Sequence, residues 1–198
     1  DCQRNITGNP QALHDQGHQA RAKLDLARQQ VAALVGATPE EIIFTASGSE
    51  ANVLALKGIA KAYMTKGKHM ITSAVEHFSV LHPIRSLEKE GFEVTSIPVD
   101  KEGVVDLQKL SVAIRTDTIL VSIMAANSEV GTIQPLAEIS KIVKAKGVLL
   151  HTDAVAAAGN IPINVAELRV DALSLAGNSF YGPLGTGALY LKKSTRLI

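Results

Sequence analysis

The sequence predicts an α/β fold, a three-layer sandwich in which helices cover both faces of a mostly parallel central sheet. Short apolar runs alternate along the chain with helical patterns of about 10–15 residues, which is typical of strand–helix–strand crossover units. The run 118–124 is almost continuously apolar, which indicates a central parallel strand buried on both faces. With 198 residues, 46% of them hydrophobic, the chain suits one medium domain with its own core.

The N-terminal part predicts a long helix followed by a short turn and a strand. A helix is expected over 11–35 because apolar residues recur there at helical spacing, and Gly36 provides the stop. Thr38 as a cap and Pro39 in the first position predict a helical turn before a short buried strand at 42–45. The apolar face of the long helix carries Leu24, Ala27, Val31 and Leu34.

The rest of the chain continues the alternation without an internal repeat or a low-complexity linker. Turn signals such as Asp100-Lys101-Glu102-Gly103 separate the elements. Further strands are expected at 70–73, 93–99, 118–124, 148–153, 172–175 and 188–191, and helices from the 46–49 loop to about 66 and over 76–90, 107–115 and 136–146.

Composition excludes several classes of function. Twenty basic and nineteen acidic residues give a net charge of +1 without a long basic block, so neither nucleic acid nor an anionic membrane is an expected partner. The single cysteine, Cys2, excludes a disulfide framework and a cysteine zinc site. No apolar run reaches about 18 residues and no signal peptide opens the sequence, so the expected location is the cytoplasm, despite an Asn5-Ile6-Thr7 glycosylation sequon.

The loops after the strands are the places where a ligand is expected. In mostly parallel sheets, ligands bind beyond the carboxyl ends of the strands. The loops to search are therefore those near 46–49, 73–77, 125–131, 153–156 and 176–187.

The 46–49 loop has the chemistry of an anion site. Gly48 is small enough for the backbone to approach a phosphate, and the Ser49 hydroxyl adds a hydrogen bond beside the first helical amides. An ordinary serine cap would give the same sequence. Gly182-Pro183-Leu184-Gly185-Thr186-Gly187 does not match the dinucleotide fingerprint and instead predicts a tight loop where backbones meet.

Two more loops carry ionisable residues. Asp153 ends an apolar strand, where a poorly solvated carboxylate needs a cationic partner such as a protonated pyridine nitrogen, or else caps the next segment. His77 begins a helix and either stacks on a flat ring and carries protons or is an ordinary surface histidine. His14 and His18 have the spacing of a metal pair but lack a third ligand, so no metal site is expected.

Together these segments resemble the NifS/IscS group of cysteine desulfurases, within the class V aminotransferases. The resemblance extends from Gly8-Asn9-Pro10 to Lys193. It rests on several motifs that occur in the same order and at a similar spacing as in the family. The matching pieces are Glu40-Glu41-Ile42-Ile43-Phe44-Thr45, Gly48-Ser49-Glu50-Ala51-Asn52, Ser73-Ala74-Val75-Glu76-His77, Asn127-Ser128-Glu129-Val130-Gly131-Thr132-Ile133-Gln134-Pro135, His151-Thr152-Asp153-Ala154, and Phe180-Tyr181-Gly182-Pro183 with Gly185.

The resemblance implies pyridoxal 5'-phosphate (PLP) as cofactor and the large domain of a PLP-dependent transferase as fold. It places Gly48 and Ser49, where the family usually has threonine, at the cofactor phosphate. It places His77 in a stack on the pyridine ring, with a part in proton transfer, and Asp153 at the ring nitrogen.

Departures from the family pattern cluster in this pocket. The lysine that forms the Schiff base corresponds to Ser179, and the histidine before it to Asn178. The phosphate-binding serine corresponds to Ala176, and the asparagine and glutamine near the ring hydroxyl correspond to Ser128 and Ala156. Serine cannot form an imine, so PLP is expected to bind non-covalently and weakly, or not at all.

The family also has an N-terminal segment and a C-terminal small domain that carries a sulfur-accepting cysteine and a substrate-binding arginine. Residues 1–198 are expected to form the large domain without either part, and Cys2 is in the wrong place to be that cysteine. The expected partner is a second copy or a complementary chain, and beyond that a sulfur acceptor or an iron–sulfur scaffold protein.

Three hypotheses follow from the sequence. The first is a desulfurase-family domain that still binds PLP but is impaired or inactive alone, and the second is a non-catalytic relative or scaffold subunit that contacts sulfur-transfer or iron–sulfur partners. The clustered departures from the family pattern favour the second hypothesis over catalysis by this chain alone. The third, a nucleotide-binding regulator on a similar sheet, lacks a fingerprint.

Overall fold

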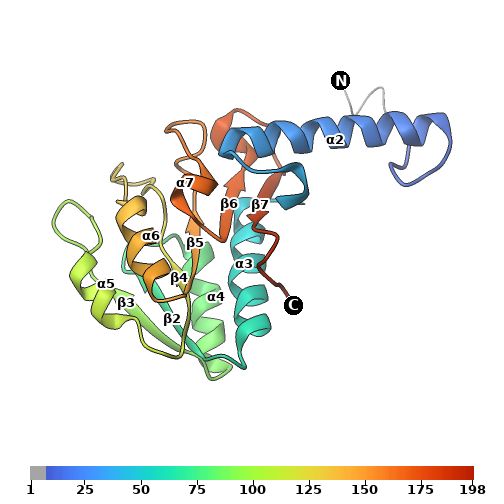
Figure 1. Cartoon of the computed structure of the whole chain (residues 1–198). Coiled ribbons are helices and arrows are strands. Elements are labelled where there is room, and N and C mark those ends of the chain that lie inside the picture. Colours follow the sequence, from blue (N-terminus) through green and yellow to red (C-terminus); the bar gives the residue numbers. More distant parts are fainter. Residues whose placement is uncertain (1–7) are drawn as a thin grey trace.

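The computed structural model describes residues 8–198 (Figure 1), so Cys2 and the Asn5-Ile6-Thr7 sequon lie outside the described residues. The strands are β1 (Ile42–Thr45), β2 (His69–Ser73), β3 (Glu93–Ile97), β4 (Thr118–Ser122), β5 (Leu149–Asp153), β6 (Ala172–Ala176) and β7 (Gly187–Leu191). The helices are α2 (Asp15–Val35), α3 (Gly48–Tyr63), α4 (Phe78–Lys89), α5 (Leu107–Ala113), α6 (Leu136–Ala145) and α7 (Val165–Leu168), with 3-10 helices η1 (Pro39–Glu41) and η2 (Gly177–Phe180).

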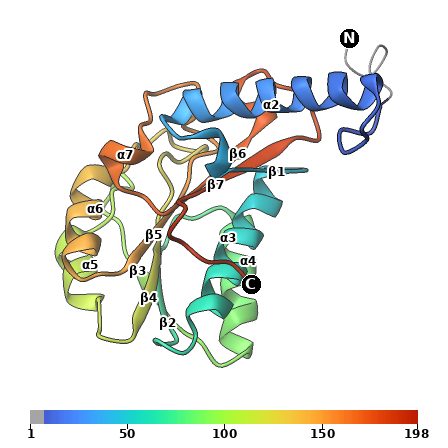
Figure 2. The same ribbon diagram turned by 45° about the vertical axis from the view of Figure 1, so that its right-hand side comes forward.

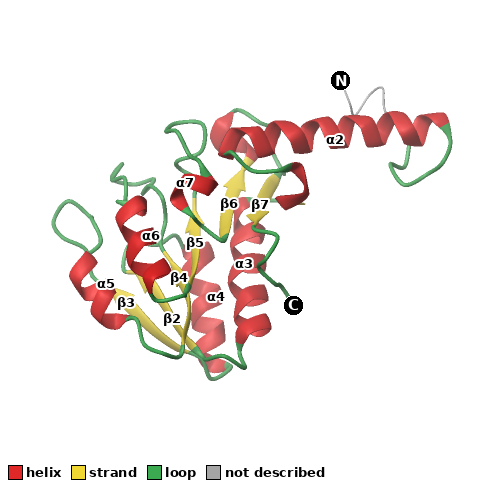
Figure 3. Cartoon of the chain, in the orientation of Figure 1, coloured by secondary structure: helices red, strands yellow, loops and turns green. Residues whose placement is uncertain are grey.

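The seven strands form one sheet in the order β1-β7-β6-β5-β4-β2-β3. Figure 3 shows strands of this sheet in yellow between the red helices. Strands β3, β2, β4, β5 and β6 run parallel, whereas β7 is antiparallel to both β6 and β1. The prediction of a mostly parallel sheet is therefore confirmed. Strand β4 lies inside the parallel part with every residue buried, as its continuous apolar run predicted.

Helices cover both faces of the sheet (Figure 2), and an apolar layer lies between the sheet and the helices on each face. Helices α3 and α4 pack on one face against Met70, Leu120 and Leu189. Helices α5, α6 and α7, with the C-terminal end of α2, cover the other face, where Ile71 and Val121 contribute to the core. Neighbouring strand residues alternate between the two layers because successive side chains of a strand point to opposite faces. The predicted three-layer sandwich is confirmed.

The predicted elements differ from the observed ones mainly at their ends. The strand expected at 93–99 stops at Ile97, because Pro98 has no N–H to continue a ladder. The first helix begins at Asp15 rather than at 11, because the His14 side chain caps it by accepting the Gly17 N–H at 3.2 Å. The short helices α7 and η2 were not predicted. No helix in the described range is long and apolar enough to cross a membrane.

Helix α2 does not bury the apolar face that its spacing predicted. Its buried apolar residues are Ala20, Ala32 and Val35, whereas Leu24 and Leu34 remain 38% and 37% exposed. Only the C-terminal end of α2 lies on the body of the domain, and the rest projects from it (Figure 1). The predicted face instead lines an open apolar groove, whose other wall includes Phe44, Phe180 and Pro183.

Buried histidines tie the parallel strands together. His151 on β5 lies 2.9 Å from Ser122 Oγ on β4 and 3.0 Å from Ser174 Oγ on β6. His69 on β2 makes the same kind of link, at 2.7 Å to Thr118 on β4 and 2.9 Å to Thr95 on β3. Complete burial lowers the pKa of His151 from 6.5 to about 3, so this imidazole is neutral in the folded chain.

Replacing His151 with glutamine should weaken the dependence of stability on acid. Below pH 6.5 the unfolded chain protonates His151 but the folded chain does not until about pH 3. The free energy of unfolding should therefore fall by about 1.4 kcal/mol per pH unit across this window from this group alone. Urea unfolding between pH 6.5 and 4 should show a shallower slope for His151→Gln, while exposed His82→Gln keeps the wild-type slope. Equal slopes for all three proteins would contradict a buried neutral His151.

Candidate functional site

A cavity of about 260 Å³ opens at the carboxyl ends of the parallel strands, where ligands are expected in such sheets. All five loops singled out in the sequence contribute to its wall. Every residue predicted to contact the cofactor lines it: Gly48, Ser49, His77, Ser128, Asp153, Ala156, Ala176 and Asn178, together with Ser47, Ser79, Met124, Ala126 and Val155. Ser179 is not among the lining residues.

The N-terminus of α3 forms one end of the cavity. Ser47 is the N-cap, and its side chain accepts the Glu50 N–H at 3.1 Å while its carbonyl accepts the Ala51 N–H. The earlier amides, of Gly48 and Ser49, have no carbonyl to bond within a helix. A side chain at Gly48 would place Cβ 2.5 Å from Val155, so glycine is required for this close packing. The result is a pair of donors at the positive end of a helix dipole, suited to an anion.

Asp153 supplies a buried negative group at the floor of the cavity. The residue is 5% exposed, at the end of β5. Its Oδ1 accepts the Val155 N–H at 3.0 Å, and its Oδ2 accepts Asn52 Nδ2 at 2.7 Å. Burial raises the pKa of this carboxyl, and those two hydrogen bonds and the nearby His77 oppose the rise. A cationic ligand group at this point would favour the ionised form.

His77 caps α4, which confirms that it begins the helix. The imidazole Nδ1 accepts the Ser79 N–H at 3.1 Å and lies 2.7 Å from Ser79 Oγ. Ser79 Oγ is in turn 2.8 Å from Asn52 Nδ2. Asn52 therefore connects His77 at one wall of the cavity with Asp153 at its floor.

Glu76 is a second buried carboxyl next to the cavity. Its Oε1 accepts Ser73 Oγ at 2.6 Å and the Met124 N–H at 2.9 Å, which ties β2 to the chain after β4. Its Oε2 has no hydrogen-bond partner among the described residues. Burial raises the pKa of Glu76 to about 8, the two hydrogen bonds limit the rise, and the Asp153 charge adds to it.

The segment 176–187 folds back on itself as a tight loop. The Gly177 N–H donates to the Thr186 carbonyl and the Gly182 N–H to the Gly177 carbonyl, at 2.9 and 2.7 Å. A Cβ on Gly187 would lie 2.4 Å from the Ser47 carbonyl carbon, so backbones do meet here as predicted. Ser179 lies half-buried in η2 within this loop, one residue after Asn178.

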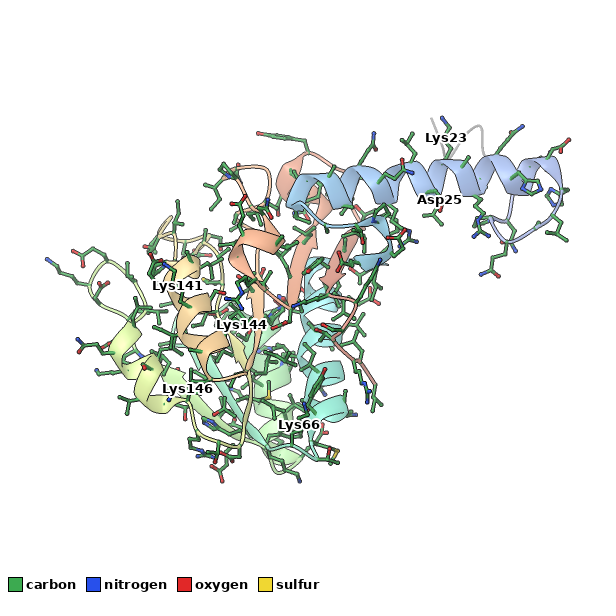
Figure 4. The ribbon with its side chains drawn as sticks, in the orientation of Figure 1. Lys23, Asp25, Lys66, Lys141, Lys144 and Lys146 are labelled. Atoms are coloured by element: carbon green, nitrogen blue, oxygen red, sulfur yellow. The ribbon has the colours of Figure 1, made fainter. Side chains whose placement is uncertain are left out.

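Within residues 8–198, no lysine or arginine lines the cavity. Lys57 borders the neighbouring surface groove, where Ser86 Oγ accepts from its amine at 2.9 Å and Glu90 lies 3.8 Å away. Lys144 on α6 is paired with Asp171 (Figure 4). Lys66 follows the far end of α3, a helix about 24 Å long at a rise of about 1.5 Å per residue.

Sequence reasoning assigned no role to Asn52, Ser79 and Glu76. Asn52 is fully buried on α3, one helical turn after Gly48, and polar residues buried in a helix require partners. Its position one helical turn after Gly48 is the only sequence signal that could have identified Asn52. His14 and His18 lie one turn apart at the start of α2, and the described residues contain no group of three or more ligating side chains that could hold a metal ion.

Comparisons with known proteins identify the family of the chain. The family described as aminotransferase class-V matches residues 2–196. Cysteine desulfurase IscS of Dictyoglomus turgidum is 53% identical over 190 residues, which cover 96% of this chain and 48% of that protein. Human (Homo sapiens) cysteine desulfurase is 47% identical over 194 residues, covering 98% and 42%.

Solved structures show the same similarity. A NifS-like protein superposes with a TM-score of 0.96 at 40% identity, over 99% of this chain and 54% of that one. The apo structure of cysteine desulfurase from Thermococcus onnurineus NA1 gives a TM-score of 0.86 at 32% identity, over 92% and 46%.

The chain therefore belongs to the aminotransferase class-V family, and its fold is that of the large domain of PLP-dependent transferases. Within this family its close relatives are the IscS/NifS cysteine desulfurases. The chain spans about half the length of the relatives it matches.

The Glu76→Gln variant should lose less stability than wild type as the pH rises. Between pH 4.5 and about 8 the folded chain keeps the Glu76 proton that the unfolded chain releases, so the free energy of unfolding falls as pH rises, by about 1.4 kcal/mol per pH unit from this group. Urea unfolding at pH 5.5 and 7.5 should give a smaller drop for Glu76→Gln than for wild type. Exposed Glu138→Gln should behave as wild type, and an unchanged drop in Glu76→Gln would show that Glu76 is ionised in the folded chain.

Proposed function

We propose that this chain is the PLP-binding part of a cysteine desulfurase-family protein, that it holds PLP without a covalent bond, and that it is inactive in sulfur release alone. The observation that carries the proposal is a cavity that has groups for the ring and the phosphate but no amine. Bound PLP would supply an electron-withdrawing pyridinium ring. The chain's residues would bind and orient it.

The residues of the cavity fit the cofactor at two points. Asp153, a buried carboxylate, would accept from a protonated ring nitrogen and keep it charged. The amides of Gly48 and Ser49, with the Ser49 hydroxyl, would hold the phosphate at the α3 N-terminus. His77 would lie against the ring.

The residues do not fit covalent attachment or tight binding. Ser179 has no amine, and no lysine among residues 8–198 lines the cavity. Ala176, Ala156 and Ser128 stand where the family has larger polar groups. Each missing neutral hydrogen bond removes about 0.5–1.5 kcal/mol, so several losses together lower the affinity by orders of magnitude.

A second candidate is a non-catalytic scaffold subunit, and the clustering of the departures favours it. Four of the five departures line one cavity, and the fifth, Ser179, follows Asn178 directly. The sheet, the two apolar layers and the tight 176–187 loop are meanwhile intact. This pattern is expected where the fold is retained for a partner while the chemistry is lost. Such a chain would contact a sulfur acceptor or an iron–sulfur scaffold protein, as a homodimer or with a complementary chain.

The Ser179→Lys variant should acquire a covalent imine that wild type lacks. A primary amine restored at this position has a flexible four-carbon stem to reach the cavity, and serine has none. Titration with PLP, read by absorbance and by mass after borohydride reduction, should label Ser179→Lys alone. Leu184→Lys, an exposed change in the same loop, is the matched control. A reducible adduct on wild type at a single lysine would refute the proposal.

The Asp153→Asn variant should bind PLP about 10–100-fold more weakly than wild type, because a hydrogen bond to a charged group contributes about 1.5–3 kcal/mol. Equilibrium dialysis or quenching of PLP fluorescence measures the difference. Asp106→Asn, which keeps a good N-cap for α5, is the control and should bind like wild type. Absence of PLP binding by wild type, with a normal fold, would favour the scaffold candidate.

A further inference from the structure

His77 is held at the cavity by two contacts from Ser79 to the same ring nitrogen. The Ser79 backbone N–H donates to Nδ1 at 3.1 Å, and Ser79 Oγ lies 2.7 Å from the same atom. A backbone N–H donates and never accepts, so Nδ1 carries its lone pair here and not a proton. In a neutral imidazole the proton is then on Nε2.

Asn52 sets the direction of the hydroxyl in this arrangement. Asn52 Nδ2 lies 2.7 Å from Asp153 Oδ2 and 2.8 Å from Ser79 Oγ. An ionised Asp153 accepts only, so the amide donates one N–H to the carboxylate and the other to Ser79. Because Ser79 Oγ accepts from Asn52, its own proton is free to go to His77 Nδ1. The direction of every bond runs outward from Asn52.

We propose that Asn52 and Ser79 are positioning residues that fix His77 as its Nε2–H tautomer, so that His77 presents a hydrogen-bond donor to the ligand and not a base. Asn52 does not line the cavity, and the Ser79 hydroxyl lies within hydrogen-bond distance of Asn52 and His77. Asn52 and Ser79 act through the ring of His77 at one end and the carboxylate of Asp153 at the other. The use of this donor by PLP or its substrate rests on the proposed function, whereas the tautomer itself does not.

The reverse direction of the bonds is less favourable. If Asp153 were protonated and donated to the amide oxygen, the Asn52 NH₂ group would turn to the position of the present Oδ1. That position has no partner among residues 8–198, and Asn52 is 0% exposed. Two stranded N–H donors would replace one stranded acceptor, and unpaired buried N–H groups are the rarer and costlier case.

The arrangement changes what His77 does in the pocket. The structure gives its Nε2 no partner among the described residues, so the Nε2–H is available to a ligand oxygen, such as a carboxylate or a phenolate. Nε2 already carries a proton in this tautomer, so it cannot accept another. Proton uptake at Nδ1 would remove the cap from α4. The chain thus favours binding and orientation by His77 over proton transfer.

The tautomer can be read in the 198-residue chain without PLP by long-range ¹H–¹⁵N correlation of the histidine rings, with His77 assigned through His77→Gln. The expected spectrum has an unprotonated Nδ1, shifted far downfield, and a protonated Nε2. A protonated Nδ1 with a bare Nε2 would overturn the proposal. Because no ligand is added, failure here is separate from failure of PLP binding.

Two variants test the roles of Asn52 and Ser79. Ser79→Ala removes the hydroxyl donor, so the Nδ1 resonance should move further downfield while the backbone N–H retains the tautomer. Asn52→Leu should cause a smaller shift in the same direction, because the Ser79 hydroxyl loses the amide N–H that polarises it. Asn164→Leu, at the N-cap of α7, is the matched control and should leave His77 unchanged. If Asn52→Leu fails to fold, Ser79→Ala alone decides, and wild-type shifts in Ser79→Ala would refute the hydroxyl link.

Discussion

The buried carboxylate of Asp153 constrains most of what surrounds it. A charge at the end of β5 is poorly solvated, so it requires donors from the neighbouring elements, and the Val155 amide and Asn52 provide them. Asn52 must then lie on the face of α3 that packs against the sheet, one turn after the α3 N-terminus. The same amide extends to Ser79 and His77 on α4. The Asp153 carboxyl therefore connects the sheet, the N-terminal end of α3 and the cap of α4.

The electrostatics of the cavity differ at its two ends. The anion end depends on backbone amides of α3, since no lysine or arginine among the described residues lines the cavity. The cation end depends on Asp153. A zwitterionic ring compound with a phosphate fits this polarity. The positive side is provided by amide dipoles and not by a charged side chain. Salt and water weaken the attraction of such dipoles more than that of a charge in a buried ion pair. The departure at Ala176 lies at this end, because a Cβ on Gly48 would come within 3.2 Å of the Ala176 Cβ.

Most of the fold could be predicted from the sequence because strand and helix periods are local signals. Three features were each predicted from a few residues, and the structure confirms them: the buried strand β4, the helix stop at Gly36 and the turn at Thr38–Pro39. The loops that meet at the cavity were also predicted, since a parallel sheet brings the carboxyl ends of its strands to one edge. The roles of His77 and Asp153 came from family resemblance and remain predictions.

What the sequence could not predict depends on contacts between distant segments. Asn52 and Asp153 are separated by 101 positions, and nothing local to Asn52 indicates its partner. Glu76 reads as an ordinary helix-start residue until β4 is placed beside β2. The exposure of the apolar face of α2 could not be predicted for a related reason, because spacing shows which residues share a side of a helix but not whether another element covers them.

The projecting part of α2 gives the domain an uneven resistance to local opening. Residues 21–26 are all exposed, whereas Ala32 and Val35 belong to the core. Isolated helices shorter than about 12–15 residues are marginal in water, so the middle turns of α2 rely on their connection to the anchored end. Backbone amides along this helix should therefore exchange with solvent deuterium in a gradient, rapidly over the exposed turns and only with global unfolding near Val35.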